Sequence, residues 1–317
     1  MRVLVTGAAG FIGSTTAELL LDLGHDVVAL DSLVRGRRDN VPARATFVEG
    51  EYGDVGLIRS LDAFDACVHF AARIEPAESM AYPETFFANN VGQSFAMFEA
   101  LVSTGTTRVV FSSSCAVYGD QVEMPIDEGR PTHPESPYGQ SKLMVEQGLQ
   151  WMAARGRLRY ASLRYFNAAG GTLAHPERHD PEIHLIPLAL DVAAGRREFL
   201  SIYGKDYPTS DGTCVRDYIH VADLADAHVR AIQSLESREE VVVNLGTGTG
   251  SSILQVIDSV RRVTGRDVPV RWDPRRPGDP AEAVASNLRA NDVLGWNPQK
   301  SALDDIVADA WAAHHSR

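Results

Sequence analysis

Cysteine is scarce in this chain, and so is lysine. The 317 residues include only three cysteines, without metal-ligand spacing: Cys67, Cys115 and Cys214. This argues against a disulfide framework and a cysteine-rich metal site, and it favours a reducing, cytoplasmic compartment. The only lysines are Lys142, Lys205 and Lys300, since arginine supplies the remaining basic residues. A lysine in such a chain indicates a specific role.

Long apolar runs and blocks of like charge are also missing. No apolar stretch approaches the ~20 residues of a membrane span, and the short one before Gly7 is not typical of a signal peptide. The net charge is −12, and no basic segment offsets it. We therefore expect neither a membrane nor a nucleic acid as a partner.

Short β-branched segments alternate with helical patterns in the first half of the chain. Strands are expected at 2–5, 26–30, 46–48, 66–70 and 108–112, and helices at 12–23, 55–61 and 85–103. Further on, 241–245 reads as one more core strand and 252–264 as one more helix. The alternation predicts an α/β fold, a Rossmann-like doubly wound parallel sheet with right-handed crossovers.

The length of the chain favours two unequal lobes over one hydrophobic core. We predict a dinucleotide-binding Rossmann domain over residues 1–167, with about 213–248 returning to it. Residues 168–317 are expected to form mainly a smaller α/β C-terminal lobe that binds the substrate. Its segment 274–298 reads as loop-rich and arginine-bearing.

A glycine-rich turn follows the first expected strand and opens the first helix. It contains Gly7, Gly10, Phe11, Ile12 and Gly13. Glycines so placed permit a tight turn, close approach of a pyrophosphate, and packing of the helix on the strand. The helix N-terminus adds free N–H groups and a partial positive charge. The turn therefore predicts a dinucleotide site.

An acidic residue, Asp31, ends the next expected strand. A carboxylate there accepts hydrogen bonds from the adenosine ribose hydroxyls and repels a 2′-phosphate, which favours NAD over NADP. Arg35 and Arg37 follow closely and keep the NADP alternative open. A turn cap is the structural alternative for Asp31.

Tyr138 and Lys142 lie four residues apart on an expected helix, so both side chains project from one face. A fixed ammonium beside a tyrosine favours the phenolate, and we expect it to bring the pKa of Tyr138 down toward the range of a general base. The same spacing also occurs on solvated helices, so the pair alone does not establish a catalytic site.

An ordered series of motifs runs through nearly the whole chain. They include Gly-x-x-Gly-x-x-Gly at 7–13, His-Phe-Ala-Ala at 69–72, Asn-Asn-Val at 89–91, Phe-Ser-Ser-Ser-Cys-Ala-Val-Tyr-Gly at 111–119, Ser-Pro-Tyr-Gly-Gln-Ser-Lys-Leu-Met-Val-Glu at 136–146, Leu-Arg-Tyr-Phe-Asn at 163–167, Asp-Tyr-Pro-Thr-Ser-Asp-Gly-Thr-Cys-Val-Arg-Asp-Tyr-Ile-His-Val at 206–221, Asn-Leu-Gly-Thr-Gly at 244–248 and Arg-Arg-Pro-Gly-Asp at 275–279. With this series the chain resembles the extended short-chain dehydrogenase/reductase family and, within it, the UDP-glucose (UDP-galactose) 4-epimerases.

The resemblance implies a catalytic group and a bound NAD. It assigns Ser114 to the sugar O4, Tyr138 to the base, and Lys142 to a partner of the base that also binds the nicotinamide ribose. The implied cofactor pocket comprises Gly7, Gly10, Phe11, Ile12, Gly13, Asp31, Glu51, Tyr52, Phe70, Ala71, Ala72, Asn89, Tyr138, Lys142 and Tyr165.

The resemblance also implies a binding site for a UDP-sugar. Its residues are Ser114, Asn167, His184, Leu185, Tyr203, Arg216, Arg276, Asp279 and Ala283. Arginines would hold the diphosphate by charge-assisted hydrogen bonds. Tyr203 and Leu185 could instead belong to the core, His184 could be structural, and Arg216 could form a surface ion pair with Asp217.

The sequence departs from the family pattern at several positions. Ile74 replaces a cofactor-contacting lysine, and Glu51 stands where an Asp often meets the adenine. His184 replaces an Asn, and Ala283 replaces a tyrosine that borders the C2 substituent of the sugar. Because alanine leaves room there, we expect UDP-N-acetylglucosamine and its galacto epimer as further substrates.

Other readings on the same fold remain open. Related dehydratases carry Asp-Glu after the serine, but here those positions are Cys115 and Ala116, so elimination is disfavoured. A UDP-glucuronate 4-epimerase or decarboxylase is harder to distinguish, by sequence, from a UDP-glucose 4-epimerase. A non-catalytic NAD-sensing protein is disfavoured, because such a protein is expected to have lost the base or its lysine.

A homodimer is also expected, from two amphipathic helices at about 85–103 and 137–155. In relatives the corresponding helices pair across a two-fold axis. Burial within one subunit would give a similar pattern. The apolar residues are Phe87, Val91, Phe95, Phe98, Leu143 and Leu149.

Overall fold

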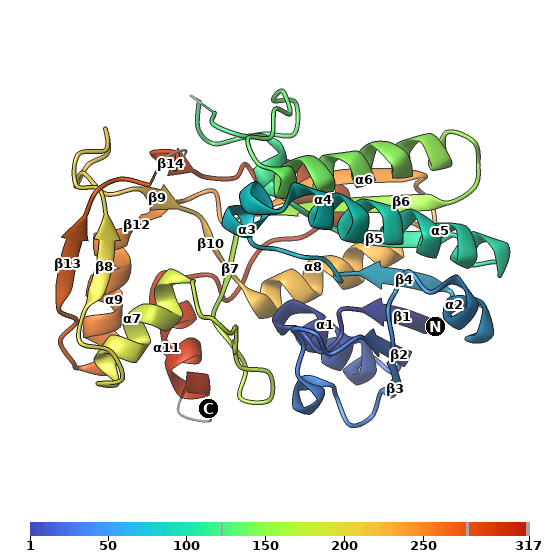
Figure 1. The fold of residues 1–317 in the computed structure, drawn as a ribbon, viewed down its shortest axis with the longest axis horizontal. Coiled ribbons are helices and arrows are strands. Elements are labelled where there is room, and N and C mark those ends of the chain that lie inside the picture. The colour runs from blue at the N-terminus through green and yellow to red at the C-terminus, as the bar shows by residue number, and fades with distance from the viewer. Residues whose placement is uncertain (122, 277–278, 315–317) are drawn as a thin grey trace.

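A parallel sheet of seven strands forms the centre of the computed structural model, which describes residues 1–121, 123–276 and 279–314. The spatial order is β11-β6-β5-β4-β1-β2-β3 (Figure 1). The strands are β1 (Arg2–Thr6), β2 (Asp26–Asp31), β3 (Thr46–Glu49), β4 (Ala66–His69), β5 (Arg108–Ser114), β6 (Arg159–Tyr165) and β11 (Glu240–Leu245). Every neighbouring pair is parallel. The Rossmann-like doubly wound fold predicted from the alternating segments is confirmed.

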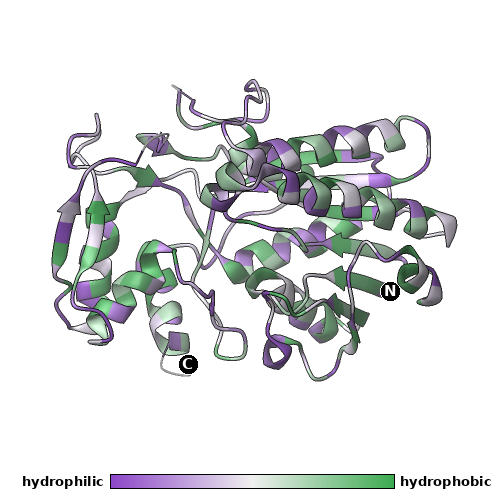
Figure 2. Cartoon of the chain, viewed as in Figure 1, coloured by the Kyte–Doolittle hydropathy of each residue, from purple (hydrophilic) through white to green (hydrophobic). Residues whose placement is uncertain are grey.

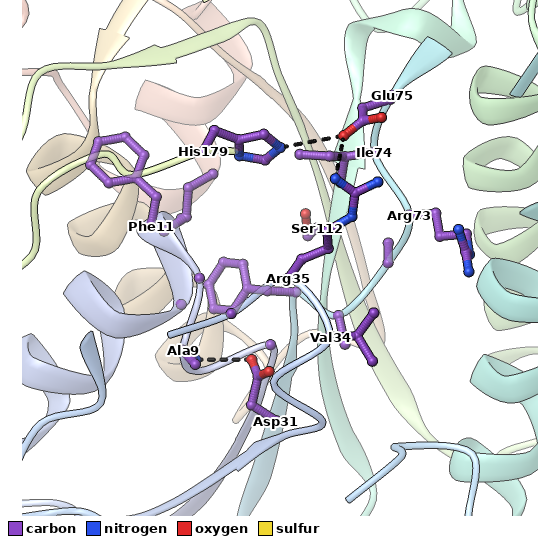
Figure 3. A pocket seen from close by; sticks show the side chains of 18 of the residues that line it. Ala9, Phe11, Asp31, Val34, Arg35, Arg73, Ile74, Glu75, Ser112 and His179 are labelled. Carbon is purple, nitrogen blue, oxygen red and sulfur yellow. Dashed lines mark hydrogen bonds and ion pairs between the residues drawn. The ribbon is translucent and has the colours of Figure 1, made fainter. Parts of the chain in front are cut away.

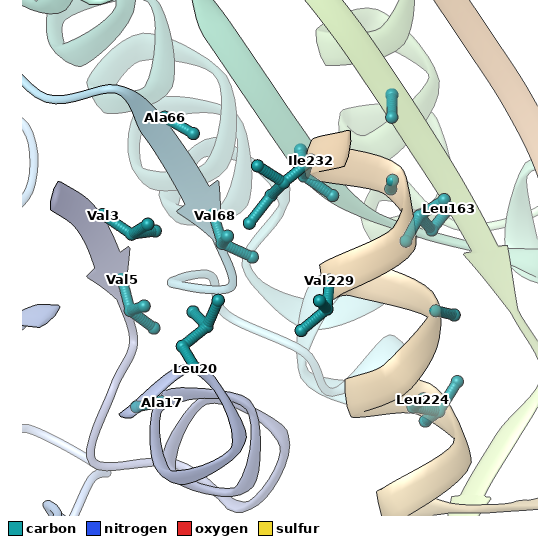
Figure 4. Close-up of a cluster of buried hydrophobic side chains, with 14 of the residues drawn as sticks. Val3, Val5, Ala17, Leu20, Ala66, Val68, Leu163, Leu224, Val229 and Ile232 are labelled. Carbon is teal, nitrogen blue, oxygen red and sulfur yellow. The ribbon is translucent and has the colours of Figure 1, made fainter. Parts of the chain in front are cut away.

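Helices cover both faces of this sheet. They are α1 (Phe11–Asp22), α2 (Val55–Ser60), α3 (Pro76–Ala81), α4 (Pro83–Phe86), α5 (Ser94–Ser103), α6 (Pro137–Ala153) and α8 (Val221–Ser234). Val3 and Val5 of β1 belong to one core cluster, together with Leu20 of α1 and Ile232 of α8 (Figure 4). Leu4 belongs to a second cluster on the other face, with side chains of α5 and α6. Alternate residues of one strand thus serve two cores.

The rest of the chain forms smaller elements, several of which pack around a third apolar cluster. They are β7 (Asn167–Ala169), α7 (Leu185–Ala193), β8 (Leu200–Tyr203), β9 (Val215–Arg216), β10 (Tyr218–His220), β12 (Ser251–Ser252), α9 (Ile253–Thr264), β13 (Val270–Asp273), β14 (Glu282–Ala283), α10 (Leu288–Leu294) and α11 (Leu303–His314). Figure 1 shows α7, α9 and α11 beside β8 and β13, away from the large sheet. Strands β9, β12 and β14 form a three-stranded sheet.

Two segments differ from the sequence-based expectation. The helix expected at 85–103 is interrupted by a π-helical stretch, η2 (Phe87–Gln93), between α4 and α5. The segment 274–298, expected to be loop-rich, contains α10, whose Ala290 and Leu294 pack in the first core cluster with Trp296. Short 3-10 helices, η1 (Arg38–Asn40) and η3 (Cys115–Val117), lie at turns.

Apolar residues follow the strands and the inner helix faces, as the colouring of Figure 2 shows. Of the apolar residues named for a dimer interface, Phe98 and Leu149 are completely buried in their own subunit. On α6, Met144 and Trp151 are the large apolar side chains left exposed. Within the described residues, no helix is long and apolar enough to cross a membrane.

Candidate active site

A cavity of about 450 Å³ lies at the carboxyl ends of β1, β2, β4, β5 and β6 (Figure 3). Strands β2 and β4 flank β1 on its two sides, so β1 marks the point where the strand order reverses. Open α/β sheets bind ligands in this crevice. All fifteen residues that the resemblance assigned to the cofactor line the cavity: Gly7, Gly10, Phe11, Ile12, Gly13, Asp31, Glu51, Tyr52, Phe70, Ala71, Ala72, Asn89, Tyr138, Lys142 and Tyr165.

The glycine-rich turn approaches its surroundings too closely for side chains. Gly7 has φ of 69°, and a Cβ there would lie 2.7 Å from the backbone nitrogen of Ala71. A Cβ on Gly13 would lie 2.2 Å from the carbonyl oxygen of Gly7. Helix α1 begins after Gly10 without a side-chain cap. Its first N–H groups therefore face the cavity without a competing side-chain acceptor.

Asp31 lies at the end of β2 and accepts two backbone hydrogen bonds. They come from the N–H of Ala9 at 3.0 Å and the N–H of Leu33 at 2.8 Å. Burial raises the pKa of Asp31, and these two hydrogen bonds oppose the rise. The carboxylate thus fixes the turn of its own segment and also lines the cavity. A capping role and a ligand-binding role are compatible at this residue.

Arg35 also lines the cavity but lies beside two acids. Its guanidinium is 3.3 Å from Glu75 and 3.5 Å from Glu78. Both acids compete with a ligand phosphate for this cation. Arg35 therefore does not support the NADP alternative, whereas Arg37, the other arginine named for it, also lines the cavity.

The π-helical stretch η2 positions Asn89 at the wall of the cavity. The Tyr52 hydroxyl donates to the carbonyl oxygen of Asn89 at 2.7 Å. Burial raises the pKa of Tyr52, so its hydroxyl stays protonated and remains a donor. Interruptions of this kind are frequent at functional sites.

Ser114, Tyr138 and Lys142 meet at one wall of the cavity. Ser114 ends β5, while Tyr138 and Lys142 lie on the first turns of α6. The Ser136 hydroxyl caps α6 by accepting from the N–H of Gly139 at 3.1 Å. A Cβ on Gly139 would lie 2.4 Å from the carbonyl oxygen of Ala116, so glycine permits α6 to approach the segment after Ser114.

Lys142 is almost completely buried, at 2% exposed. Its ammonium donates to the carbonyl oxygen of Ser112 at 2.8 Å and lies 5.8 Å from the centre of the Tyr138 ring. Ser112 also accepts a hydrogen bond from the hydroxyl of Tyr165. These contacts fix the lysine between β5 and the tyrosine.

The pKa of Tyr138 differs from the sequence-based expectation. We expected Lys142 to lower it, but burial raises the pKa of Tyr138 to about 12, and a hydrogen bond with Ser114 opposes the rise. Burial also lowers the pKa of Lys142 to about 7, against the charge of Glu146. The expectation was wrong in direction because it counted the ammonium and left out desolvation, which acts on both groups.

A buried ion pair lies one helical turn beyond Lys142. Glu146 accepts from the guanidinium of Arg164 at 2.6 Å and 2.9 Å, and from the hydroxyl of Ser113 at 2.5 Å. The hydroxyl of Tyr118 accepts from Arg164 at 2.9 Å. This network joins α6 to β5 and β6 behind the wall formed by Ser114, Tyr138 and Lys142.

The residues assigned to the substrate fall into two groups. Ser114, Asn167 and His184 line the cavity. The others lie outside it, and four of them form a connected chain of contacts. The Arg276 guanidinium stacks 3.9 Å from the centre of the Tyr203 ring, the Arg276 carbonyl accepts from the N–H of Asp279 at 3.3 Å, and Asp279 pairs with Arg216.

Ala283 and Leu185 complete the second group. Ala283 of β14 is the register partner of Arg216 on β9 and packs in a small apolar cluster beside Cys115. Leu185 begins α7 and packs against the third core cluster. Arg216 does not pair with Asp217, whose carboxylate accepts from the N–H groups of Thr247 and Ala285. Residues 277 and 278 of the Arg-Arg-Pro-Gly-Asp motif lie outside the described residues.

Comparison with known proteins shows the family to which this chain belongs. The family described as "NAD dependent epimerase/dehydratase family" matches residues 3–246. The chain belongs to the NAD dependent epimerase/dehydratase family. The UDP-glucose 4-epimerase of Streptomyces lividans is 47% identical over 99% of this chain and 96% of its own length.

Solved structures of epimerases agree with this membership. The UDP-glucose 4-epimerase from Brucella ovis in complex with NAD is 45% identical, with a TM-score of 0.95 over 99% of this chain and 98% of that chain. The UDP-glucose 4-epimerase from Bifidobacterium longum in complex with NAD+ and UDP is 34% identical, with a TM-score of 0.94 over 99% of this chain and 98% of that chain. The chain is thus an isomerase of the epimerase type, as predicted.

The residues of this family member fit NAD. The glycine cradle excludes Cβ atoms where a pyrophosphate approaches, and the uncapped start of α1 supplies N–H donors. Asp31 can receive ribose hydroxyls at the far end of the turn. Lys142 and Tyr138 line the same cavity from α6, beside β5, rather than from β1 and β2.

Several residues of this site were given no role from the sequence, although three of them lie within the family motifs. Ser112 was not singled out, although it connects Lys142 with Tyr165. Glu146 and Arg164 are 18 positions apart and follow no catalytic spacing. The segment 177–180 lines the cavity, and no site role was expected for it.

Replacing Gly13 by alanine is expected to lower the NAD content of the purified protein and to destabilise the fold by about 1–3 kcal/mol, because the added Cβ collides with the Gly7 carbonyl. NAD released on denaturation and a urea unfolding curve measure the two effects. Gly56→Ala is the control, since a Cβ there lies 3.3 Å from one Asp54 oxygen. Equal NAD content in Gly13→Ala and wild type would contradict the assignment of the cradle.

Proposed function

We propose that this protein interconverts UDP-glucose and UDP-galactose by inverting the configuration at C4 of the hexose, with NAD held as a prosthetic group. One observation carries the proposal. Ser114, Tyr138 and Lys142 line the same cavity as the glycine-rich turn and Asp31. A base and a dinucleotide cradle in one cavity suit oxidation at a single sugar carbon.

The proposed roles follow from the hydrogen bonds at this wall. Tyr138 takes the proton of the C4 hydroxyl, and Ser114, hydrogen-bonded to Tyr138, holds the sugar O4. Lys142, fixed by Ser112, favours the phenolate of Tyr138 electrostatically. When bound, NAD+ supplies the hydride acceptor and donor for C4 and a positive charge that also favours a phenolate. Tyr138 returns the proton when the 4-keto sugar is reduced on its other face.

The contact chain from Tyr203 to Arg216 is proposed to bind the nucleotide. Two arginines suit a diphosphate, because guanidinium groups bind phosphate oxygens in a bidentate manner. Arg216 lies near Cys115, where its charge opposes the rise in the pKa of that thiol, so the proposed nucleotide site adjoins Ser114. With the UDP anchored there, the sugar alone would turn between its two faces.

Elimination is not part of the proposal. Cys115 and Ala116 follow Ser114 where a dehydratase would need acids, and burial raises the pKa of Cys115 to about 11. A thiol that stays protonated is a poor base. The sequence therefore favours oxidation and return at C4 over loss of the C6 hydroxyl.

The proposal is tested by incubating the purified protein with UDP-galactose without added NAD. UDP-glucose is expected to form, because the cofactor is regenerated in each cycle and need not be added. Absence of product from a preparation that contains bound NAD would contradict the proposed activity. UDP-glucuronate in a parallel reaction tests the related uronic-acid epimerase or decarboxylase.

Ala283 is proposed to leave room for an N-acetyl group on the sugar. Ala283→Tyr is therefore expected to lower the turnover of UDP-N-acetylglucosamine, relative to that of UDP-galactose, by roughly 10–200-fold. The larger side chain would fill the space proposed for the N-acetyl group. Ala283→Ser is the matched control, since it adds only one oxygen. Brisk turnover of UDP-galactose by the wild type without any turnover of UDP-N-acetylglucosamine would disprove this assignment.

A cytoplasmic homodimer is the proposed form of the enzyme. The three cysteines are free, which suits a reducing compartment. Met144 and Trp151 on α6 are the exposed apolar side chains available for pairing with a second subunit. Sedimentation at micromolar protein is expected to give a dimer in the wild type and a monomer in Trp151→Glu.

A further inference from the structure

The segment between β7 and α7 brings together three side chains with metal-ligating atoms. They are Glu177, His179 and His184, and one ligand atom from each lies within 4.8 Å of the others. All three line the rim of the cavity and are partly buried. None of them has a role in the proposed proton and hydride transfers. The cluster is therefore a second centre of chemistry beside the active site.

Carboxylates hold this cluster in place. Nδ1 of His184 lies 2.8 Å from Oε1 of Glu182, and the same oxygen accepts from the backbone N–H groups of Ile183 and His184 at 3.0 Å and 2.9 Å. Oε1 of Glu177 accepts from the backbone N–H of His179 at 3.2 Å and lies 3.8 Å from Nδ1 of the same residue. A carboxylate on one ring nitrogen is the usual support of a metal-bound histidine, because it fixes the tautomer and the ring orientation. With Nδ1 so engaged, Nε2 of His184 is the nitrogen available to a cation.

Negative charge surrounds the two histidines. Glu75 approaches from the other wall of the cavity, with Oε1 3.7 Å from Nε2 of His179, as Figure 3 shows. Glu177 and Glu182 lie 3.8 Å and 2.8 Å from ring nitrogens of His179 and His184. Several carboxylates beside two imidazoles attract a divalent cation. Arg35 partly balances this negative charge, at 3.3 Å from Glu75.

We propose that Glu177, His179 and His184 bind one divalent transition-metal cation, of which Zn²⁺ is the best match, at the rim of the cofactor cavity. Two imidazole nitrogens and one carboxylate oxygen form a common zinc ligand set, with the fourth position open to water or another oxygen. Imidazole ligands favour zinc, cobalt or nickel over magnesium and calcium. Glu182 is the positioning residue of the site. His184 is also among the residues assigned to the UDP-sugar, so the test measures metal binding in the absence of substrate.

Binding there would join the two walls of the cavity. Glu177, His179 and His184 belong to the segment that leads into α7, whereas Glu75 immediately precedes α3. A cation held by the three ligands would lie close to Glu75, since His179 already does. It would restrain the segment 177–184 over the cofactor, so dissociation of NAD is expected to slow when the cation is bound.

The test is titration of the complete, chelator-treated protein with Zn²⁺ in a calorimeter, followed by metal analysis after gel filtration. One equivalent is expected to bind, and Mg²⁺ is expected to give no signal. Double substitution His179→Gln/His184→Gln should abolish binding, and Glu182→Gln should weaken it by roughly 10–100-fold. His133→Gln, at an exposed loop position outside the cluster, should bind as the wild type does.

Melting curves without metal exclude a folding defect, because each variant should melt as the wild type does while only proteins that bind Zn²⁺ are stabilised by it. The release of NAD is measured by diluting the protein into an excess of an NAD-scavenging enzyme. This release should be slower with Zn²⁺ in the wild type alone. Failure of the wild type to bind Zn²⁺, or equal binding by the double variant, would overturn the proposal. Since binding is measured without turnover, either result leaves the epimerase proposal separately testable.

Discussion

Tyr138→Phe is expected to lower kcat for UDP-galactose by roughly 10²–10⁴-fold, because the variant keeps the aromatic ring but loses the oxygen that takes the C4 proton. KM should change little, since the nucleotide is proposed to be bound by Arg216 and Arg276. Initial rates of UDP-glucose formation, with NAD content measured in the same preparations, provide the comparison. The NAD content should stay near that of the wild type.

The matched control is Tyr82→Phe, which removes the same hydroxyl from a side chain that is 58% exposed. Its rates should equal those of the wild type. Ser114→Ala should lie between the two variants, because it removes the hydrogen bond to the sugar oxygen while Tyr138 remains. A Tyr138→Phe protein that keeps wild-type kcat would remove the proposed base from the mechanism.

Glu146→Gln is expected to destabilise the fold by about 3–5 kcal/mol, because it leaves the charge of Arg164 buried without its partner. The two side chains are only 6% and 8% exposed, and their closest oxygen and nitrogen lie 2.6 Å apart. Urea unfolding with an unchanged slope and a lower midpoint would express the loss. The pKa of Lys142 should also fall further, since the charge of Glu146 opposes its decrease.

The control for this prediction is an exposed pair with similar geometry. Arg59 donates to both oxygens of Glu99, at 3.0 Å and 2.9 Å, but these side chains are 48% and 57% exposed. Glu99→Gln should therefore cost less than about 1 kcal/mol. The double substitution Glu146→Leu/Arg164→Met should recover part of the loss, because no charge then stays buried. Equal effects of Glu146→Gln and Glu99→Gln would contradict the importance of burial at this pair.

The parts of the site that were predicted from the sequence depend on local geometry. Gly7 and Gly13 belong to the turn that joins a strand directly to a helix. Such a tight turn leaves no room for side chains at these two positions. Asp31 follows from the length of one strand–helix–strand unit, which places it at the end of β2. Tyr138 and Lys142 share a helix face through their spacing alone.

The parts that were missed depend on contacts between distant segments. Nothing in the spacing of Glu146 and Arg164 shows that α6 and β6 place them together, and nothing near Ser112 indicates that its carbonyl accepts from Lys142. The pKa of Tyr138 was predicted in the wrong direction for the same reason. Desolvation depends on the whole fold around a residue, whereas the neighbouring charge is visible in the sequence.

One group of residues was predicted individually from the sequence, while the contacts within the group were missed. It consists of Tyr203, Arg276, Asp279 and Arg216. The resemblance named these residues individually, but their order of contact arises only when β8, β9 and the segment before β14 come together. These four connected residues are proposed to bind UDP together.

The hydrogen at C4 is proposed to leave and return within one active site. UDP-galactose deuterated at C4, converted to UDP-glucose in ordinary water, tests this directly by mass spectrometry and NMR of the product. Deuterium is expected at C4 of the inverted sugar, because a hydride passed to and from NAD does not exchange with solvent. Product with solvent hydrogen at C4 would contradict hydride transfer at this carbon.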